Sequence, residues 1–540
     1  MSSNSVEPDQ LAEKTLGIHF WAALGGVYGL LTFFSLLRVP IPGVNEPHYL
    51  CKAKHFWDPQ WCAGDLFLES SNPHLVFYAT FGWLTTFLSL DTVAVVCRFI
   101  GLIPLAIGWH LLAYRLSRNA WASLLSLSFF LVLQSAGNWS GEWLVGGIES
   151  KVIAYGFLFW SIAQALVLKL PSSALLAGLA ISFHPIVGVW GTLSAAMATL
   201  FLICLTDKKE VRDSAPPLKT WALAVLFFAL AAAPGLVSAG QAVFSESDPD
   251  STRIANLLQV GHRLGHHLDP MRFPKEAYRY FGLLIFLWLI IQPKFISVTC
   301  TRWWNSIVIA SLIIAVIGVA IGWGPRPLKE MAGYEWRINA LKFYPFRLAD
   351  LLVPIAVSIA FASQTLRCFE SCIQNKFFRN ASIYCFAASL ASCGLIIPAS
   401  DQNPSKMSPE KRQNWIEMCD WVNRSTSQES LVHSFDNQWA VKWYCARQEY
   451  VNFKDCPQDA KSIIEWNQRR WVIARWKKNA FKEGGVSADE LQELSEKTDV
   501  SIFICDRLGP FEMKPDYQNK DFRVYLVGEV GPRATLSGLE

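Results

Sequence analysis

The sequence predicts a polytopic α-helical membrane domain followed by a soluble α/β domain. Of the 540 residues, 52% are hydrophobic, and the mean hydropathy is +0.25. Charge is unevenly distributed, because 42 of the 92 charged residues lie after residue 400. The first 400 residues therefore have about half the charge density of an ordinary soluble domain. Long apolar runs fill this first part, and each is long enough to enter a bilayer. The net charge of +4 is too small and too dispersed to indicate nucleic-acid binding.

Eleven apolar segments are predicted to span the membrane: 18–38, 93–114, 119–135, 152–169, 173–184, 186–205, 219–237, 279–292, 304–323, 348–364 and 381–398. The first is too long for a signal-peptide core, so we expect it to remain as a helix. Pro185 divides the run 173–205 into two short helices, because proline breaks the helical ladder. The shorter run 75–90 predicts an interfacial helix. Residues 39–92 would thus form an acidic loop with an interfacial helix.

The distribution of cations predicts the orientation of these helices. With the N-terminus in the cytoplasm, the internal loops are short and basic. They contain Arg115, Arg118, Lys208, Lys209, Arg212, Lys294, Arg302, Arg367, Lys376 and Arg379. The density of Lys and Arg favours this orientation, whereas their raw number does not decide. An odd number of spans then places the C-terminal domain on the extracytoplasmic side.

The C-terminal domain, residues 401–540, is predicted to be α/β. Strand character occurs at 431–435, 450–453, 500–505 and 522–527, and helical spacing at 460–478 and 487–497. The segment 399–414, rich in Ser, Pro, Asn and Lys, predicts a linker. The transmembrane domain would therefore be residues 1–400.

Polar side chains collect in the loops predicted to face outward. The acidic candidates are Glu46, Glu142 and Glu149, and the basic candidates are Lys151, His184, Arg263, His266, His267, Arg337 and Arg347. His48, Asp65 and His74 are expected to support the first loop. A carboxylate at the mouth of a membrane helix is costly unless it faces water, a cation or a ligand, so Glu46 stands out. Group transfer from a phosphate donor needs both sets, since a carboxylate accepts a proton and cations or a metal stabilise the departing phosphate.

In the order of its segments, the region from about residue 15 to 290 resembles the lipid-linked-sugar glycosyltransferases of the GT-C fold. This class includes protein mannosyltransferases and aminoarabinose transferases. The matching elements are Asn45-Glu46, the re-entry Asn72-Pro73-His74, Arg98, the turn 114–119, Glu149 or Glu142, the segment 177–185 and the segment 263–267. Asn45-Glu46 stands where the family often has Asp-Glu or Asp-Asp, and His184 stands where it has lysine.

The resemblance implies an inverting, GT-C-type membrane glycosyltransferase that uses a polyprenyl-phosphate-linked sugar in the bacterial inner membrane. Glu46 would be the base or a metal ligand, Glu149 would assist it, and Lys151, His184 and Arg263 would hold the donor phosphate. A divalent cation, Mg²⁺ or Mn²⁺, would be the cofactor if Glu46 and Glu149 bind one. The acceptor remains open.

Other interpretations fit the same residues. Glu149 could simply pair with Lys151, and Arg337 and Arg347 could be interfacial anchors. A transporter or flippase for a lipid-linked or anionic substrate would need charges along a pathway inside the spans. A non-enzymatic membrane assembly protein would tolerate substitution at Glu46 and Glu149. The C-terminal domain also resembles uncharacterised bacterial membrane proteins in its Trp415-Ile416, Glu465-Trp466 and Arg469 pattern.

Overall fold

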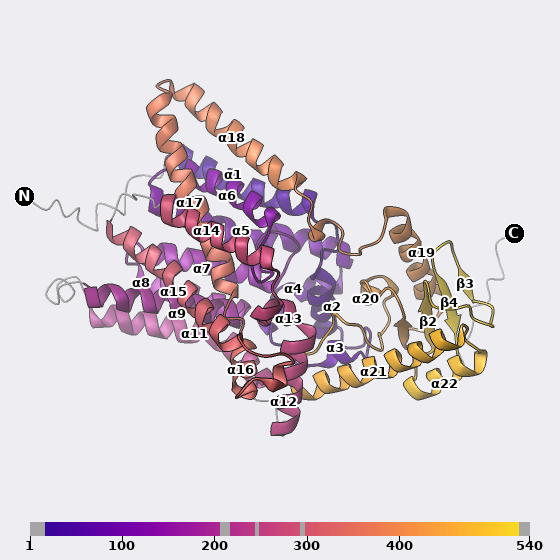
Figure 1. Cartoon of the computed structure of the whole chain (residues 1–540). Coiled ribbons are helices and arrows are strands. Elements are labelled where there is room, and N and C mark those ends of the chain that lie inside the picture. Colours follow the sequence, from indigo (N-terminus) through magenta and orange to yellow (C-terminus); the bar gives the residue numbers. More distant parts are fainter. Residues whose placement is uncertain (1–16, 206–215, 244–247, 292–297, 529–540) are drawn as a thin grey trace, which may run out of the picture.

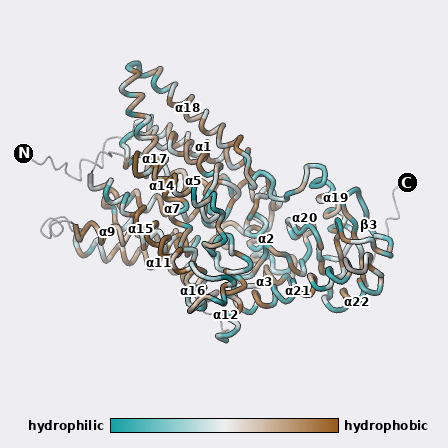
Figure 2. The backbone as a smooth tube through the Cα atoms, viewed as in Figure 1, coloured by the Kyte–Doolittle hydropathy of each residue, from teal (hydrophilic) through white to brown (hydrophobic). Residues whose placement is uncertain are grey.

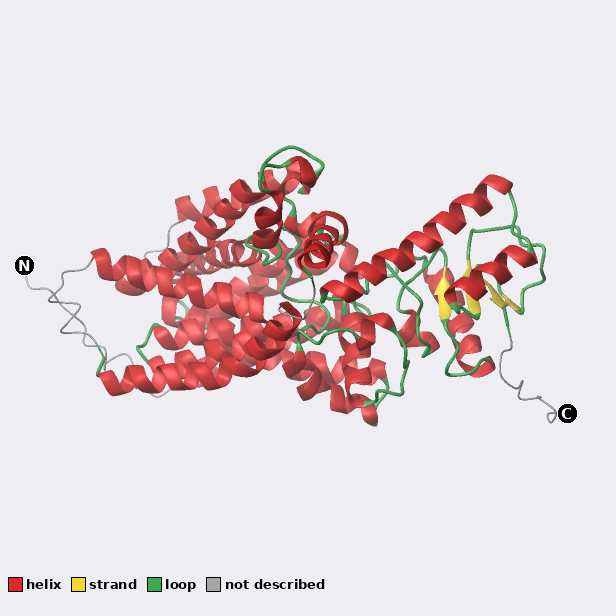
Figure 3. Ribbon diagram, turned by 90° about the horizontal axis from the view of Figure 1, so that it is seen from below, coloured by secondary structure: helices red, strands yellow, loops and turns green. Residues whose placement is uncertain are grey.

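A bundle of apolar helices occupies most of the molecule, and a region containing a small sheet lies at one end of it (Figure 1). The computed structural model describes residues 17–205, 216–243, 248–291 and 298–528. Lys208, Lys209, Arg212 and Lys294, which entered the predicted orientation, lie outside the described residues. All the described strands are in the C-terminal region (Figure 3). The predicted class, a helical membrane protein followed by an α/β region, is confirmed.

Each predicted apolar segment corresponds to one helix. These helices are α1 (Ile18–Arg38), α5 (Leu90–Ser117), α6 (Trp121–Ala136), α7 (Ser150–Ala165), α8 (Leu170–Phe183), α9 (Pro185–Leu205), α11 (Leu218–Val243), α14 (Lys275–Ile291), α15 (Val298–Gly322), α17 (Arg347–Cys372) and α18 (Lys376–Ile396). Within the described residues, α1, α5, α9, α11, α15 and α17 are long and apolar enough to cross a membrane. The eleven crossings remain a prediction, because several of the other helices are shorter. The break at Pro185 between α8 and α9 is confirmed.

The helices differ in how much of their surface other helices cover. α17 is the most deeply buried of the six long apolar helices, whereas α11 exposes large apolar side chains such as Val225, Leu230 and Val237. A helix with such a surface fits a lipid environment. Hydrophobic segments concentrate in the bundle, and hydrophilic ones around α12 (Pro249–Leu257), α16 (Tyr334–Leu341) and the C-terminal region (Figure 2).

Close backbone contact joins α5 to α7. A Cβ atom on Gly108 would lie 2.3 Å from the carbonyl oxygen of Gly156, and one on Gly156 would lie 2.5 Å from the backbone nitrogen of Leu105. Small residues allow helices to approach this closely in a membrane. The crossing fixes the start of α7, which carries several of the candidate site residues.

Short helices form the loops at the end of the bundle that meets the C-terminal region (Figure 1). The first loop contains α2 (Glu46–Trp57), α3 (Leu66–Glu69), α4 (Leu75–Phe81) and η2 (Gly82–Thr86). The helical structure of 75–86 agrees with the prediction, and its interfacial position remains a prediction. The later loops contain η3 (Leu258–Arg263), α13 (Gly265–Leu268), η4 (Pro270–Arg272) and η5 (Leu328–Glu330).

The C-terminal region is a four-stranded sheet with helices beside it. Its elements are η6 (Ser400–Gln402), α19 (Pro409–Ser425), β1 (Val432–Ser434), α20 (Val441–Cys445), α21 (Ala460–Glu483), α22 (Ala488–Thr498), β2 (Ile502–Cys505), β3 (Tyr517–Gln518) and β4 (Arg523–Leu526). The strand order is β1-β2-β4-β3, with β1 and β2 parallel and the other pairs antiparallel. The domain boundary at residue 400 remains a prediction.

Two predictions about this region are wrong. Residues 450–453 form no strand, because only the neighbouring Glu449 makes an isolated bridge, to Val432. The linker predicted at 399–414 ends early, because α19 begins at Pro409 with Ser408 as its N-cap. Serine followed by proline is a strong helix start, and this signal outweighs the polar composition of the segment.

Candidate functional site

Glu46, the leading acidic candidate, is fully buried against Arg98 of α5. Its Oε1 accepts hydrogen bonds from Arg98 Nε (2.7 Å) and from the backbone N–H of Ile148 (2.8 Å). Its Oε2 accepts from Arg98 Nη2 (2.8 Å) and from the backbone N–H of Gly43 (2.6 Å). Each oxygen thus accepts two hydrogen bonds, which is the usual capacity of an ionised carboxylate. This geometry suits a positioning role and leaves no acceptor for the proton that the predicted base would take.

Arg98 also donates hydrogen bonds to the backbone at the end of α1. Its guanidinium donates to the carbonyl oxygens of Ser35 (3.0 Å), Val39 (2.7 Å) and Pro40 (2.9 Å). The Glu46–Arg98 pair therefore joins the end of α1, the start of α2 and the chain just before α7. The positive charge of Arg98 therefore compensates the buried carboxylate of Glu46 inside the protein.

The remaining two acidic candidates meet three of the basic ones in a group that we call the acid–base cluster, made of Glu142, Glu149, Lys151, His184 and Arg347. Lys151 Nζ lies 3.5 Å from Glu142 Oε1 and 3.5 Å from Glu149 Oε2. Arg347 Nε lies 3.0 Å from Glu142 Oε2, and Arg347 Nη1 donates to His184 Nε2 at 3.1 Å. Three segments distant in sequence, 137–151, the α8–α9 break and the start of α17, thus converge.

The elements around the cluster explain its geometry. Glu149 is the N-cap of α7 and accepts a hydrogen bond from the Asn45 side chain. Burial raises the pKa of the Glu149 carboxyl above its usual value, while the charge of Lys151 and the bond from Asn45 oppose that shift. Asn45 directly precedes Glu46, so the Glu46–Arg98 pair and the cluster are adjacent.

Asp350, near the start of α17, holds the loop that carries Glu142. Its carboxylate accepts hydrogen bonds from the backbone N–H groups of Trp139 (2.6 Å), Ser140 (2.8 Å) and Glu142 (3.1 Å). We did not predict this role from the sequence. An acidic residue at the start of an apolar helix could have signalled it, because such a side chain needs a partner.

His74 of the first loop lies against the cluster. Its Nδ1 is 3.2 Å from Ser150 Oγ, and its ring centroid is 4.9 Å from that of His184. The hydroxyl of Tyr49 is 3.5 Å from His74 Nε2. Burial lowers the pKa of His74 to about 3, so this imidazole is neutral at pH 7. His74, which was predicted to support the first loop, thus packs against His184 of the acid–base cluster.

The candidates in the segment 258–272 fall into two groups. His267 Nδ1 lies 2.6 Å from the carbonyl oxygen of Ser140, and burial lowers the pKa of His267 to about 3. A neutral imidazole whose N–H points at a carbonyl is poorly suited to bind a phosphate anion. Arg263 instead faces the C-terminal region, because its Nη2 donates to the carbonyl oxygen of Lys454 at 3.0 Å. His266 is exposed beside His267, with ring centroids 4.0 Å apart.

Arg337 makes its contacts elsewhere. Its guanidinium donates to the carbonyl oxygens of Ile321 (3.2 Å) and Trp323 (2.9 Å), where α15 ends. It therefore stabilises a helix C-terminus. The structure brings Arg347 into the cluster, whereas the contacts of Arg337 do not include it.

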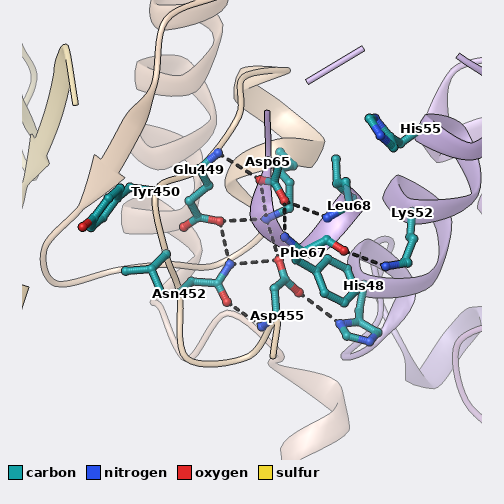
Figure 4. A network of polar contacts seen from close by, with 12 residues as sticks. His48, Lys52, His55, Asp65, Phe67, Leu68, Glu449, Tyr450, Asn452 and Asp455 are labelled. Atoms are coloured by element: carbon teal, nitrogen blue, oxygen red, sulfur yellow. Dashed lines mark hydrogen bonds and ion pairs between the residues drawn. The ribbon is translucent and has the colours of Figure 1, made fainter. Parts of the chain in front are cut away.

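A buried polar network connects the first loop with the C-terminal region (Figure 4). At its centre, Lys442 Nζ lies 2.7 Å from Asp455, 3.1 Å from Glu449 and 3.3 Å from Asp65. Asp65 also caps α3 by accepting from the backbone N–H groups of Phe67 and Leu68, both at 3.0 Å. Asp65, which was expected to support the first loop, thus caps a helix of that loop and also contacts the C-terminal region through Lys442.

His48, the third residue predicted to support the first loop, also takes part in this contact. Its Nδ1 lies 3.1 Å from Asp455 Oδ1. Lys442 and Asp455 were not singled out in the sequence, because charged residues in a polar domain carry no pattern that distinguishes a buried partner from a solvated side chain.

The predicted metal ligands do not fit a divalent cation. Glu46 is saturated by Arg98 and backbone N–H groups, and Glu149 faces Lys151 and Asn45. In the part of the chain that the structure describes, no group of three or more His, Cys, Asp or Glu side chains is arranged to hold a metal ion. Cationic side chains occupy the positions next to these carboxylates, so no step is assigned to a metal here.

A protein family and solved structures both show similarity to this chain. A family described as a domain of unknown function (DUF6798) matches residues 413–473. The match includes Trp415, Glu465 and Arg469, the residues whose pattern resembled an uncharacterised family, and it also includes Lys442 and Asp455. No curated protein matches the chain.

Among solved structures, ArnT from Cupriavidus metallidurans bound to undecaprenyl phosphate is similar to this chain, with a TM-score of 0.49 and 10% identity. The similarity covers 97% of this chain and 100% of the ArnT chain. A likeness at this level does not identify the activity of this protein.

Proposed function

We propose that this protein is a membrane-embedded, inverting glycosyltransferase that moves a sugar from a polyprenyl-phosphate donor to an acceptor at the extracytoplasmic face. One observation carries the proposal. The acid–base cluster combines two cations, the buried Lys151 and the partly buried Arg347, with two buried carboxylates, Glu142 and Glu149, at the end of the helical bundle. Glycosyl transfer from a phosphate needs this division, because the departing phosphate is anionic while the sugar develops positive charge.

Lys151 is the side chain best suited to bind the donor phosphate. Its ammonium lies 3.5 Å from each carboxylate, and its position 4.1 Å from the Trp143 ring centroid orients it further. Strong hydrogen bonds between an ammonium and a carboxylate are about 2.7–2.9 Å long. The ammonium thus retains donor capacity that a phosphate oxygen could use.

Arg347 would complete the phosphate site. Glu142 and His184 orient its guanidinium, and the Tyr344 ring lies 4.1 Å from it. Because His184 accepts a hydrogen bond from Arg347, its role in this proposal is to position that arginine. Arg263 and His266 remain proposed contacts for a second part of the donor.

Glu149 would face the reacting sugar. Its Oε1 is held by Asn45, whereas its Oε2 has only the long contact with Lys151. A carboxylate placed in this way can stabilise the positive charge that develops on the sugar ring. Glu46 would keep Asn45 and the start of α7 in place through Arg98.

Binding of undecaprenyl phosphate to the purified protein in detergent tests the phosphate site directly. We expect K151M and R347M each to weaken binding at least about tenfold, which corresponds to about 1.4 kcal/mol. K461M is the matched control, because Lys461 is exposed in the first turn of α21. Unchanged affinity in both cluster variants would remove the basis of the proposal.

Turnover tests the reaction itself. With a panel of polyprenyl-phosphate hexoses and cell-envelope acceptors, the wild-type protein should release free polyprenyl phosphate. E149Q should retain donor binding while transfer falls about 10²-fold or more. Movement of intact donor across a proteoliposome membrane would indicate a transporter instead. Donor neither cleaved nor moved would favour an assembly role.

A further inference from the structure

The proposed reaction needs a group that accepts the proton of the acceptor, and Glu46 is not free to do so. His48 lies two residues further along α2 and faces the C-terminal region. Its Nδ1 is 3.1 Å from Asp455 Oδ1 (Figure 4). An imidazole held by a carboxylate in this manner is the arrangement by which many enzymes orient a general base.

The position of Asp455 is tightly constrained. Its Oδ2 lies 2.7 Å from Lys442 Nζ and accepts a hydrogen bond from Asn452 Nδ2 at 2.9 Å. Its backbone N–H donates to Asn452 Oδ1 at 2.7 Å. With Oδ2 occupied, Oδ1 remains for His48. Lys442 and His48 hold the pKa of Asp455 well below its usual value despite burial, so the side chain is a carboxylate at neutral pH.

This constraint fixes the tautomer of His48. A carboxylate can only accept hydrogen bonds, so the Nδ1 of His48 must carry the proton that lies between the two groups. Burial lowers the pKa of His48, and the imidazole is therefore neutral at pH 7 with a lone pair on Nε2. Within the described residues, no hydrogen bond occupies Nε2, and the side chain retains 20% exposure.

A row of aromatic rings connects His48 with the acid–base cluster. The ring of His48 lies 5.6 Å from that of Tyr49, which is 5.3 Å from the ring of His74, which is in turn 4.9 Å from His184. The charged or titratable groups that act on His48 are Asp455, Lys454 and Lys52, and His48 in turn affects His74. To act as a base, His48 needs the acceptor hydroxyl to lie on its own side of this row of rings, within hydrogen-bond distance of Nε2.

We propose that His48 is the proton acceptor for the acceptor substrate and that Asp455, from the C-terminal region, is its positioning residue. This inference rests on the proposed transferase function and assigns one of its missing roles. The site would then be composite, because residues 413–473 supply Asp455 and its partner Lys442 while the helical bundle supplies the phosphate-binding cations.

The acceptor hydroxyl oxygen forms a bond to the anomeric carbon while its proton passes to His48 Nε2. The bond from the anomeric carbon to the phosphate oxygen breaks, and its electron pair leaves with polyprenyl phosphate beside Lys151 and Arg347. The imidazolium is stabilised by Asp455 and later returns its proton to water.

A purely structural role for the His48–Asp455 contact makes different predictions, and the chain offers a matched control. Asp459, the N-cap of α21, also fastens the C-terminal region to the first loop by accepting from the backbone N–H of Ser71 at 3.2 Å. The D459N variant weakens a similar link without touching His48. D455N and D459N therefore separate orientation of the imidazole from attachment of the two regions.

Chemical modification tests the geometry without reference to the reaction. Diethylpyrocarbonate reacts with a neutral, accessible imidazole nitrogen, and peptide mass spectrometry at pH 7 gives the rate at each histidine. We expect His48 to be modified in the native full-length protein, several-fold more slowly in D455N and at the wild-type rate in D459N. A His48 that stays unmodified, or that reacts equally in both variants, would overturn the assignment.

Transfer kinetics then test the role. For a donor that the wild-type protein cleaves, H48Q should lower the transfer rate constant by about 10²–10⁴ while undecaprenyl phosphate binding stays within threefold. D455N should lower the rate constant and move the acid limb of its pH profile to lower pH, because the carboxylate no longer favours the imidazolium. D459N should leave that limb in place. Wild-type transfer in H48Q would refute the proposal for His48, whereas the absence of cleavage by the wild-type protein would refute the transferase function and leave the modification result standing.

Discussion

At the scale of single residues, buried charged side chains lie next to side chains of opposite charge. The sequence marks Glu46 as costly, and the structure gives it a fully buried partner, Arg98, with two backbone N–H groups completing its hydrogen bonds. Glu149 and Lys151 do pair, which was the simpler of the two interpretations of these residues. The pair is long and shared with Glu142, however, so it retains capacity for a ligand.

Removal of Arg98 alone should destabilise the protein more than removal of both charges of the Glu46–Arg98 pair. In R98M the Glu46 carboxylate stays buried without its cation, and loss of one partner of a buried pair costs about 3–5 kcal/mol. In E46Q/R98M the charge is gone while an oxygen remains for the backbone N–H groups, so stability should partly recover. Thermal unfolding followed by size-exclusion chromatography measures this order, and equal destabilisation of both variants would contradict it.

Glu449 should make the stability of the protein depend on pH. Burial raises the pKa of Glu449 to about 7 from an ordinary 4.5, while the charge of Lys442 opposes that shift. Between these values the native state holds a proton that the unfolded state lacks, so the stabilisation is present at low pH and is lost as pH rises toward 7. The unfolding midpoint should fall by a few degrees more between pH 5 and pH 8 in the wild type than in E449Q. An identical pH dependence in the two proteins would show that Glu449 does not titrate in this range.

At the scale of elements, the length of the apolar segments predicts the helices well, whereas local residue character predicts the short strands less well. Each apolar segment became a helix, because a long apolar run at low charge density has few alternatives. Residues 450–453 have the aromatic and β-branched side chains of a strand, but Asn452 and the nearby Asp455 instead join the polar network of Lys442. Tertiary contacts therefore override the local pattern in this segment.

The α5–α7 crossing offers a test at this scale. A methyl group added at Gly156 would meet the backbone of α5 at 2.5–2.6 Å, and a packed backbone cannot move aside as a side chain can. We expect G156A to destabilise the protein by about 1–3 kcal/mol. G25A is the control, because nothing lies within 4 Å of the added atom on α1. A midpoint in G156A equal to that of G25A would show that the helices are not closely packed in the membrane.

At the scale of the whole molecule, the first loop is the meeting point of the two regions. It provides Asn45 and His74 to the acid–base cluster and Asp65 and His48 to the network with the C-terminal region. The C-terminal region is therefore attached where the candidate site lies. This attachment brings Asp455 to within 3.1 Å of His48.

Loss of Lys442 should release this attachment. K442M leaves Asp65, Glu449 and Asp455 buried together without their shared cation, which we expect to cost about 3–5 kcal/mol. Limited digestion with chymotrypsin should then cleave the C-terminal region several-fold faster than in the wild type, while K461M should match the wild type. Unchanged digestion of K442M would contradict the proposed attachment.

The sequence predicted which residues belong to the candidate site better than it predicted how they are arranged. Glu142, Glu149, Lys151, His184 and Arg347 were all named from their place in loops predicted to face outward, and the structure brings them together. Arg337 and His267 came from the same reasoning, yet one makes its contacts at a helix end and the other is a neutral imidazole bonded to a backbone carbonyl. A position in one of these loops makes a contact between two residues possible, but it does not determine which residues are in contact.

The sequence alone determined the helical membrane class, the break at Pro185 and the collection of polar loops at one end, because these follow from hydrophobic length, proline chemistry and charge density. Only the tertiary structure decided how the charges pair: Glu46 with Arg98, Lys151 between two carboxylates, and His48 with Asp455 across about 400 residues of chain. Pairing depends on distances of 3–4 Å between side chains from separate elements, and no local pattern in a sequence encodes such distances.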